Sequence, residues 1–202
     1  MNQGYYLYEF NKFLLENMKF IIEKVGVPKT VIEIGVFQGY FTFNMTHMAV
    51  QIHPDYKHYS IDPYDISHDL DDDIVQDAYF RFQHNLKVTP YPKNIEHLKL
   101  RSWDGLLSLI NRSVKADLIY VDGDHMATTV LDDLVLSYKL LNIGGVMLCD
   151  DSTTWGSELN KSKPINHSPR LAVDSFIQCN WDKIQLLEIP KSYQTAFIKR
   201  VE

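Results

Sequence analysis

The sequence predicts a doubly wound α/β fold, in which helices cover both faces of a mostly parallel, seven-stranded sheet whose last strand is antiparallel. Short apolar runs alternate along the chain with longer segments that carry apolar residues at helical spacing. Strands that are apolar almost throughout are typical of a parallel sheet covered on both faces. Near the C-terminus only residues 190–192 separate two apolar runs, a spacing that permits a hairpin and therefore an antiparallel last pair.

The expected elements follow one another in the order that such a fold requires. A leading helix over Tyr6–Val25 carries apolar residues on one side and is stopped by Gly26 and Pro28. The expected strands are 30–36, 58–62, 95–100, 116–122, 144–150, 181–189 and 193–200. The expected helices between them are 39–50, 71–86, 102–110, 128–141 and 170–179. Ser102 is expected to cap the N-terminus of its helix.

The chain has 202 residues, a length that suits one domain with a substantial core. We therefore assign residues 1–202 to a single domain with a helical N-terminal extension over 1–27. The polar segment 152–169 is expected to form a lid or substrate loop. Tyr5, Tyr6 and Tyr8 are weaker candidates for substrate contact, and the leading helix could serve a homo-oligomer interface.

Charge and apolar content argue against several classes of protein. The formal net charge is −6 and the basic residues are scattered, whereas a general nucleic-acid binder needs a basic face. No apolar run approaches the roughly 18 residues that span a membrane, and the N-terminus lacks a signal-peptide pattern. Cys149 lies in an apolar run and is expected to be a buried thiol. We therefore expect a cytoplasmic protein with no membrane partner.

The loop after the first strand has the spacing of a ligand-binding turn. It runs from Glu33 through Gly35 to Gly39, and the two glycines allow a sharp turn and close approach of a ligand. A dinucleotide fingerprint would need glycine where Phe37 stands, so close approach of a pyrophosphate is obstructed. The spacing instead suits a ligand that joins a cationic amino acid to a nucleoside. The alternative is an ordinary turn between a strand and a helix.

Asp62 ends the second strand, where a carboxylate can accept hydrogen bonds from both hydroxyls of a ribose. The alternative is an aspartate that caps a turn before Pro63. Ser102 and Trp103 follow the third strand, where a hydroxyl and a ring could hold and stack an adenine. Trp103 could equally belong to the core.

Three further carboxylates follow the fourth and fifth strands. Asp122 ends the fourth strand, and Asp150 and Asp151 end the fifth. Parallel neighbours would bring these acids to one edge of the sheet, where they repel one another unless a cation lies between them. Oxygen ligands of this kind fit Mg²⁺ or a similar hard divalent ion. The alternative is that the three acids are solvated loop residues.

His125 lies three residues after Asp122 in the same loop. From there its ring could reach a substrate oxygen beside the metal, and the ordinary pKa of histidine, near 6.5, suits a general base. Asp124 could be a fourth ligand, a partner of His125 or a turn residue, and we favour the turn. The other seven histidines are assigned no role.

Taken together, these residues resemble the class I S-adenosylmethionine-dependent methyltransferases, which have a Rossmann-like fold. Within that class, 31–151 is most similar to metal-dependent O-methyltransferases that act on macrolide sugars and cephamycin precursors. The resemblance implies that Glu33, Gly35 and Gly39 face the methionine end of the cofactor, that Asp62 binds ribose, and that Ser102 and Trp103 flank adenine. It also implies that Asp122 serves both the cofactor pocket and the metal, with Asp150 and Asp151 as further ligands.

The resemblance therefore predicts transfer of a methyl group from S-adenosylmethionine to a hydroxyl of a small molecule or sugar, with Mg²⁺ bound and His125 as base. Catechol-type relatives have a lysine where this chain has His125, so catechol is a poor candidate for the acceptor. Three alternatives stay open. They are a metal-independent methyltransferase acting on nitrogen or carboxylate, a nicotinamide-dependent oxidoreductase, and a non-catalytic nucleoside-binding module.

Overall fold

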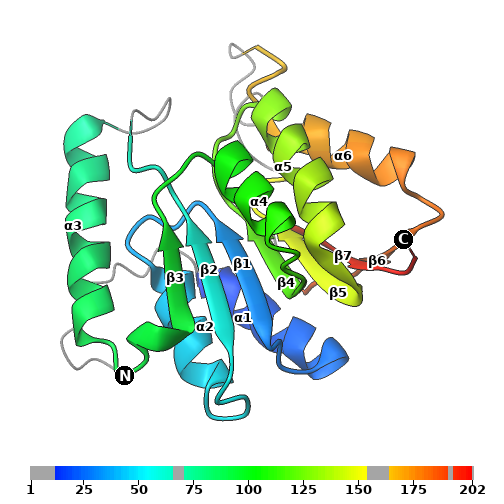
Figure 1. The fold of residues 1–202 in the computed structure, drawn as a ribbon. Coiled ribbons are helices and arrows are strands. Elements are labelled where there is room, and N and C mark those ends of the chain that lie inside the picture. Colours follow the sequence, from blue (N-terminus) through cyan, green and yellow to red (C-terminus); the bar gives the residue numbers. More distant parts are fainter. Residues whose placement is uncertain (1–11, 66–70, 154–163, 191–192, 202) are drawn as a thin grey trace.

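A computed structural model describes residues 12–65, 71–153, 164–190 and 193–201. Its centre is a seven-stranded sheet in the order β3-β2-β1-β4-β5-β7-β6 (Figure 1). The strands are β1 (Thr30–Ile34), β2 (Lys57–Ile61), β3 (Ile95–Leu98), β4 (Ala116–Val121), β5 (Leu141–Cys149), β6 (Ile184–Leu187) and β7 (Thr195–Lys199). The helices are α1 (Lys12–Val25), α2 (Tyr40–Ala49), α3 (Asp72–Val88), α4 (Ser102–Asn111), α5 (Ala127–Leu140) and α6 (Pro169–Cys179), with a 3₁₀ turn, η1, at Pro92–Asn94.

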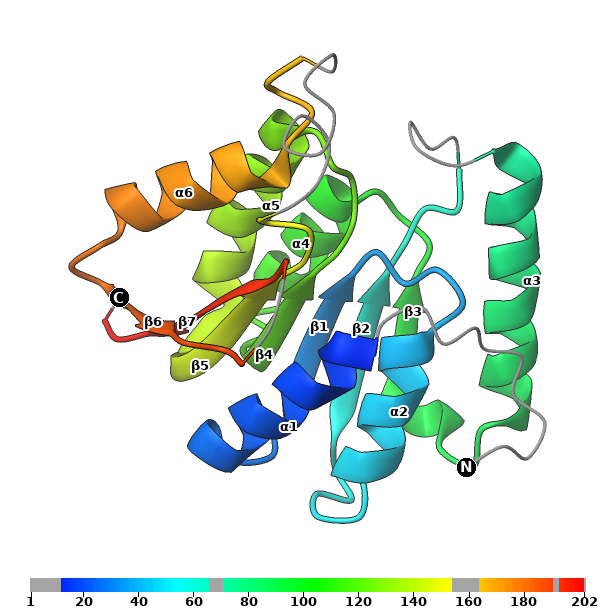
Figure 2. The same cartoon turned by 180° about the vertical axis from the view of Figure 1, so that it is seen from behind.

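The predicted doubly wound architecture is confirmed. Strands β1 to β5 pair in parallel, whereas β7 is antiparallel to both β5 and β6. Helices α4, α5 and α6 cover one face of the sheet, and α1 and α2 cover the other, as the view from behind shows (Figure 2). The two-residue period of each strand divides its side chains between these faces.

Alternate residues of one strand enter different cores. Ile32 and Ile34 of β1 pack with α4, α5 and α6, whereas Val31 packs with α1 and α2. In β4, Ile119 and Val121 face the first of these cores, and Tyr120 faces the second. A third, smaller core joins α2, α3 and the start of β3. Polar residues that share a strand face with Tyr120 or Val31 therefore point toward α1 and α2.

The boundaries of several elements differ from those predicted. Helix α5 ends at Leu140 and β5 begins at Leu141, so the strand starts three residues before the predicted residue 144 and follows the helix directly. The prediction that Ser102 caps α4 is wrong, because Arg101 occupies the N-cap position and Ser102 is the first helical residue. Strand β6 is shorter than its apolar pattern indicated, because the turn that follows α6 extends to Lys183.

Some predictions fall outside the described residues. Tyr5, Tyr6 and Tyr8 do so, as does most of the predicted loop 152–169. Among the described residues, no helix combines the length and the apolar character needed to cross a membrane. Cys149 is a buried free thiol, as predicted.

Candidate functional site

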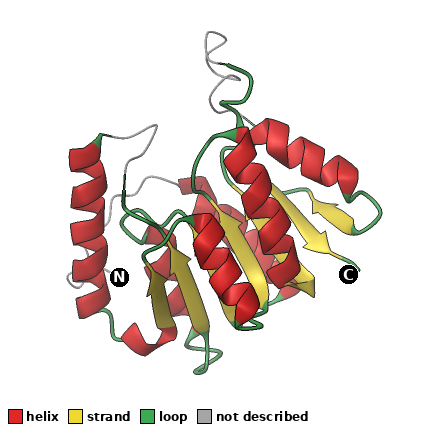
Figure 3. Cartoon of the chain, turned by 45° about the horizontal axis from the view of Figure 1, so that its top comes forward, coloured by secondary structure: helices red, strands yellow, loops and turns green. Residues whose placement is uncertain are grey.

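Four site residues directly follow the ends of neighbouring strands. Ile34 of β1 is in register with Ile61 of β2 and Val121 of β4, and Val121 is in register with Cys149 of β5. The residue that follows each of these strands therefore lies at the same edge of the sheet, which is turned toward the viewer in Figure 3. These residues are Gly35, Asp62, Asp122 and Asp150. The parallel order predicted from the sequence thus places these residues side by side.

Backbone hydrogen bonds continue the sheet into this edge. The Gly35 N–H donates to the Ile61 carbonyl at 3.0 Å, and the Asp122 N–H donates to the Ile34 carbonyl at 2.8 Å. The Asp150 N–H donates to the Val121 carbonyl at 2.9 Å. The first residue of each loop is therefore fixed by its neighbouring strand.

The glycine loop needs its glycines because it is packed closely by other parts of the chain. Gly35 has φ +81°, and a Cβ there would lie 1.8 Å from the backbone oxygen of Asp122. Gly39 has φ +83°, and a Cβ there would collide with the rings of Phe43 and Phe82. Phe37, between them, also has a positive φ of 51°. The loop is thus held against the loop that follows β4.

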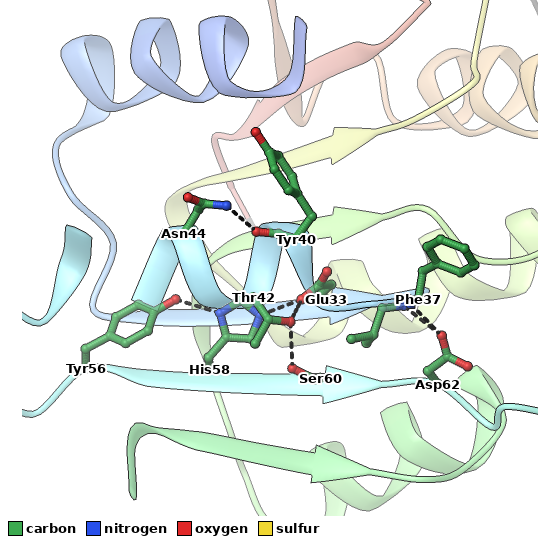
Figure 4. A network of polar contacts seen from close by, with 10 residues as sticks. Glu33, Phe37, Tyr40, Thr42, Asn44, Tyr56, His58, Ser60 and Asp62 are labelled. Atoms are coloured by element: carbon green, nitrogen blue, oxygen red, sulfur yellow. Dashed lines mark hydrogen bonds and ion pairs between the residues drawn. The ribbon is translucent and has the colours of Figure 1, made fainter. Parts of the chain in front are cut away.

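Asp62 organises the glycine loop through its side chain. One carboxylate oxygen accepts the backbone N–H groups of Val36 and Phe37 at 2.8 and 3.0 Å (Figure 4). The other oxygen accepts the N–H of Tyr64 at 2.8 Å. Burial raises the pKa of Asp62, and these N–H donors oppose the rise. Asp62 therefore fixes the glycine loop, and Oδ1, which accepts one N–H, keeps a lone pair for a ligand.

Glu33 lies in a buried polar network below this edge, on the side of α2 (Figure 4). Its carboxylate accepts a hydrogen bond from Thr42 and is 2.8 Å from His58 Nε2. His58 Nδ1 is in turn 2.7 Å from the Tyr56 hydroxyl, and the hydroxyls of Thr42 and Ser60 are 3.2 Å apart. Burial raises the pKa of Glu33, and His58 lowers it. The network thus ties the strand before the glycine loop to α2 and β2.

The acids after β4 and β5 share one hydroxyl. The Tyr120 hydroxyl is 2.9 Å from Asp122 Oδ2, and it also contacts Asp150 Oδ2. Burial is the main reason that the pKa of Asp122 lies well above its ordinary value, and the charges of Asp150 and Asp151 add to the rise. Burial also raises the pKa of Asp150. A cation placed here would remove this repulsion.

His125 lies among these acids. Its Nε2 is 3.2 Å from Asp151 Oδ2. One ligand atom each of Asp122, His125 and Asp151 lie within 4.8 Å of one another. A cavity of about 10 Å³ lies against Asp122, His125 and Asp150, which is about the room that one water molecule or ion needs. Asp124 Oδ1 accepts the N–H of Met126 at 3.2 Å, as expected of a turn residue.

The start of α4 carries an exposed ring and lies near a buried acid of α5. Trp103 is 48% exposed, so it is not part of the core. Asp133 of α5 is only 1% exposed, and neither of its oxygens has a hydrogen-bond partner of normal geometry. Burial raises the pKa of Asp133 to about 7, although the nearby Ser102 hydroxyl lowers it.

Sequence reasoning missed several polar residues around the site. His58 was assigned no role, yet His58 and Ser60 alternate on β2 and therefore share the face of Glu33, a pattern that could have revealed them. Tyr120 stands two residues before Asp122 on the same strand face and could have been found in the same way. Gln194, which donates to Asp150 at 3.0 Å, precedes β7, and no local signal marks it.

Comparison with known proteins identifies the family. Residues 32–152, more than half of the chain, match the family model of a methyltransferase domain. The chain belongs to this family of methyltransferase domains. Over 140 residues it is 28% identical to the uncharacterized protein R132 of Acanthamoeba polyphaga mimivirus, covering 68% of this chain. This methyltransferase spans 57% of that relative's length.

Solved structures share the fold of this methyltransferase at low sequence identity. The methyltransferase PaMTH1 of Podospora anserina, bound to S-adenosylhomocysteine, superposes with a TM-score of 0.66 at 15% identity, covering 96% of this chain and 80% of the other. The O-methyltransferase TomG of Streptomyces achromogenes, bound to S-adenosylmethionine and involved in tomaymycin synthesis, gives 0.65 at 16% identity, covering 93% and 80%. An O-methyltransferase of Bacillus cereus in complex with S-adenosylhomocysteine gives 0.60 at 15%, covering 98% and 84%.

Proposed function

We propose that this methyltransferase transfers the methyl group of S-adenosylmethionine to a hydroxyl of a small molecule or sugar, with a divalent cation bound at the sheet edge. The observation that carries the proposal is that Asp122, His125 and Asp151 each place one ligand atom within 4.8 Å of the others beside the glycine loop, while Asp150 shares the Tyr120 hydroxyl with Asp122. The net charge of −6 gives no support for a nucleic-acid acceptor.

The cofactor would lie along the strand ends, from the glycine loop to α4. Gly35 and Gly39 would take its methionine end, while Glu33, whose buried carboxylate contacts Thr42 and His58, would hold the strand before that loop. Asp62 would accept a ribose hydroxyl with the lone pair that Oδ1 keeps. Ser102 and the exposed ring of Trp103 would flank adenine, and Asp122 would lie between cofactor and cation.

The residues present fit a divalent cation. Asp122, Asp150 and Asp151 would hold it, because crowded carboxylates repel one another and favour a hard cation; burial and this repulsion raise the pKa of Asp122 and of Asp150. When bound, such an ion would supply Lewis-acid stabilisation of a deprotonated acceptor oxygen. Mg²⁺ and Mn²⁺ both suit this donor set.

The side chains would then assist two steps, removal of a proton from the acceptor hydroxyl and transfer of the methyl group. His125 Nε2 would take the proton of the acceptor hydroxyl, and Asp151 would stabilise the resulting imidazolium. The acceptor oxygen would bond to the methyl carbon as the carbon–sulfur bond breaks, with the electron pair passing to sulfur. Holding oxygen, methyl and sulfur in line is the task of the fixed loops after β1 and β4.

A radiolabelled methyl-transfer assay against a panel of sugars, phenols and natural-product alcohols tests this proposal. We expect turnover that EDTA abolishes and Mg²⁺ restores. Asp150→Ala should remove metal-dependent turnover while S-adenosylhomocysteine still raises the melting temperature. Asp124→Asn is the matched control, since an amide oxygen can still accept the Met126 N–H. Full turnover in excess EDTA would contradict the role of the metal.

The His125–Asp151 pair favours one second candidate, a methyltransferase in which this pair acts as a base without metal. His125→Ala separates the roles. If His125 acts only as a base, the substitution lowers kcat and leaves Mn²⁺ affinity unchanged, whereas the loss of a ligand lowers both. The metal-free candidate predicts instead that His125→Ala lowers kcat in an enzyme whose turnover excess EDTA does not change.

A further inference from the structure

Two buried side-chain amides, those of Asn17 and Gln194, connect helix α1 by hydrogen bonds to Asp150 at the sheet edge. Asn17 Nδ2 of α1 donates to Gln194 Oε1 at 2.7 Å, and Gln194 Nε2 donates to Asp150 Oδ2 at 3.0 Å. Asn17, Gln194 and Asp150 are 0%, 4% and 6% exposed. Water therefore cannot readily replace any of these three side chains.

We propose that Gln194 and Asn17 are positioning residues, which fix the Asp150 carboxylate for a divalent cation and so make α1 a part of the metal site. This inference rests on the proposed metal site and adds residues that neither touch the cation nor belong to the strand-end loops. It assigns a role at the metal site to a helix that the sequence indicated as an N-terminal extension and a candidate oligomer interface.

These hydrogen bonds fix the rotation of the Asp150 side chain. Oδ2 is held by Gln194 and Tyr120, while Oδ1 accepts the N–H of Asp151 at 2.9 Å. The Oδ1 atom has a second lone pair, which is then the natural donor to a cation. Removing the hold on Oδ2 would let the carboxylate turn and would cost ligand geometry.

Asn17 decides which end of the Gln194 amide faces the acid. A carboxylate accepts hydrogen bonds, so Gln194 must present its nitrogen to Asp150 and its oxygen to a donor. Asn17 Nδ2 is that donor. Without it, the reversed amide would place an oxygen against a carboxylate in a poorly solvated site, where such contacts are costly.

The fold explains why these distant residues meet. Tyr120 is on the face of β4 that packs with α1, and Asp150 follows Leu148, which lies on the same face of β5. Strand β7 runs antiparallel beside β5, with Thr195 opposite Cys149, so Gln194 is placed beside Asp150. The antiparallel strand β7 thus brings Gln194, near the C-terminus, to the sheet edge where the metal would bind.

Calorimetric titration of Mn²⁺ into the S-adenosylhomocysteine complex, with no acceptor present, tests the inference. Gln194→Met keeps the length of the side chain but removes its hydrogen bonds, and we expect a roughly 10- to 100-fold weaker Kd, as for other outer-sphere ligand partners. Asn17→Leu should give a smaller loss. Asn142→Leu is the matched control, because Asn142 also donates from Nδ2 to a carboxylate, Asp117 at 2.9 Å, at the other end of β5.

The outcomes separate the two claims. An unchanged Kd in Gln194→Met, with normal binding by the wild-type protein, would overturn the positioning role alone. Failure of the wild-type protein to bind Mn²⁺ would overturn the metal site, and this inference with it.

A measurement on the wild-type protein covers the case in which Gln194→Met does not fold. On titration with Mg²⁺, the side-chain amide NMR signals of Gln194 and Asn17 should shift while that of Asn142 does not. Signals of Gln194 that stay in place as the metal binds would overturn the positioning role.

Discussion

The carboxyl group of Asp133 is buried where the fold stabilises its charged form poorly. Replacing Asp133 should therefore change how the stability of the protein depends on pH. The side chain is buried near Ser102, the first residue of α4, and neither oxygen has a hydrogen-bond partner of normal geometry. Burial raises its pKa from 3.8 to about 7. In the unfolded chain the pKa returns to its ordinary value, so the folded protein holds a proton that the unfolded chain has released between about pH 4 and 7.

The sign and size of the effect follow from this difference. A folded-state pKa that is raised gives stability that is present at low pH and is lost as the pH rises through about 7. One pKa unit corresponds to about 1.4 kcal/mol, so the free energy of unfolding should fall by up to about 4 kcal/mol between pH 4 and pH 8 from this group alone. For a chain of this size that amounts to roughly 10 °C in melting temperature.

Asp133→Asn removes the ionisable group, so the variant should lack this fall in stability. Urea unfolding followed by tryptophan fluorescence at pH 5, 6, 7 and 8 gives the free energy of unfolding at each pH. Asp132→Asn is the matched control, because it makes the same change at the neighbouring, exposed position. The reasoning is refuted if Asp133→Asn and the wild-type protein lose stability equally between pH 5 and pH 8.

Three further changes test other parts of the site. In thermal melts, Gly35→Ala should destabilise the protein far more than Gly144→Ala. Both glycines have a positive φ, which costs alanine roughly 1–2 kcal/mol, but only at position 35 would the added Cβ also collide with backbone. Asp62→Ala should weaken S-adenosylhomocysteine binding at least about 10-fold by calorimetry, because the glycine loop loses its anchor; unchanged affinity would count against that anchor. Tyr120→Phe should lower the free energy of unfolding of the metal-free protein by about 1–3 kcal/mol, because Asp122 and Asp150 lose the hydroxyl that they share. In a thermal melt, Mn²⁺ should recover part of that loss.

The sequence predicts well those parts of the structure that depend on local pattern. The apolar runs locate every strand of the sheet, and the short break after residue 189 predicts the antiparallel pair β6 and β7. Because parallel strands end at one edge, the sequence also predicts that Asp122 and Asp150 are neighbours, as the register of Val121 and Cys149 shows.

What the sequence does not predict depends on side-chain direction and on contacts between distant segments. The pattern around Glu33 indicates a ligand loop, but the carboxylate points toward α2 and contacts His58 from another strand. Gln194 reaches Asp150 only because β7 reverses beside β5. No spacing along the chain encodes that contact. Trp103 shows the same difficulty, since only packing decides whether such a ring is exposed.

The central claim is that the acids at one edge of the sheet hold a divalent cation beside the cofactor. A crystal grown with S-adenosylhomocysteine and Mn²⁺, measured for anomalous scattering, tests it most directly. We predict a manganese peak within ligand distance of Asp122, Asp150 and Asp151, with the cofactor along the loop of Gly35 and Asp62. A cofactor bound on this loop with no anomalous peak among the three acids would contradict the claim.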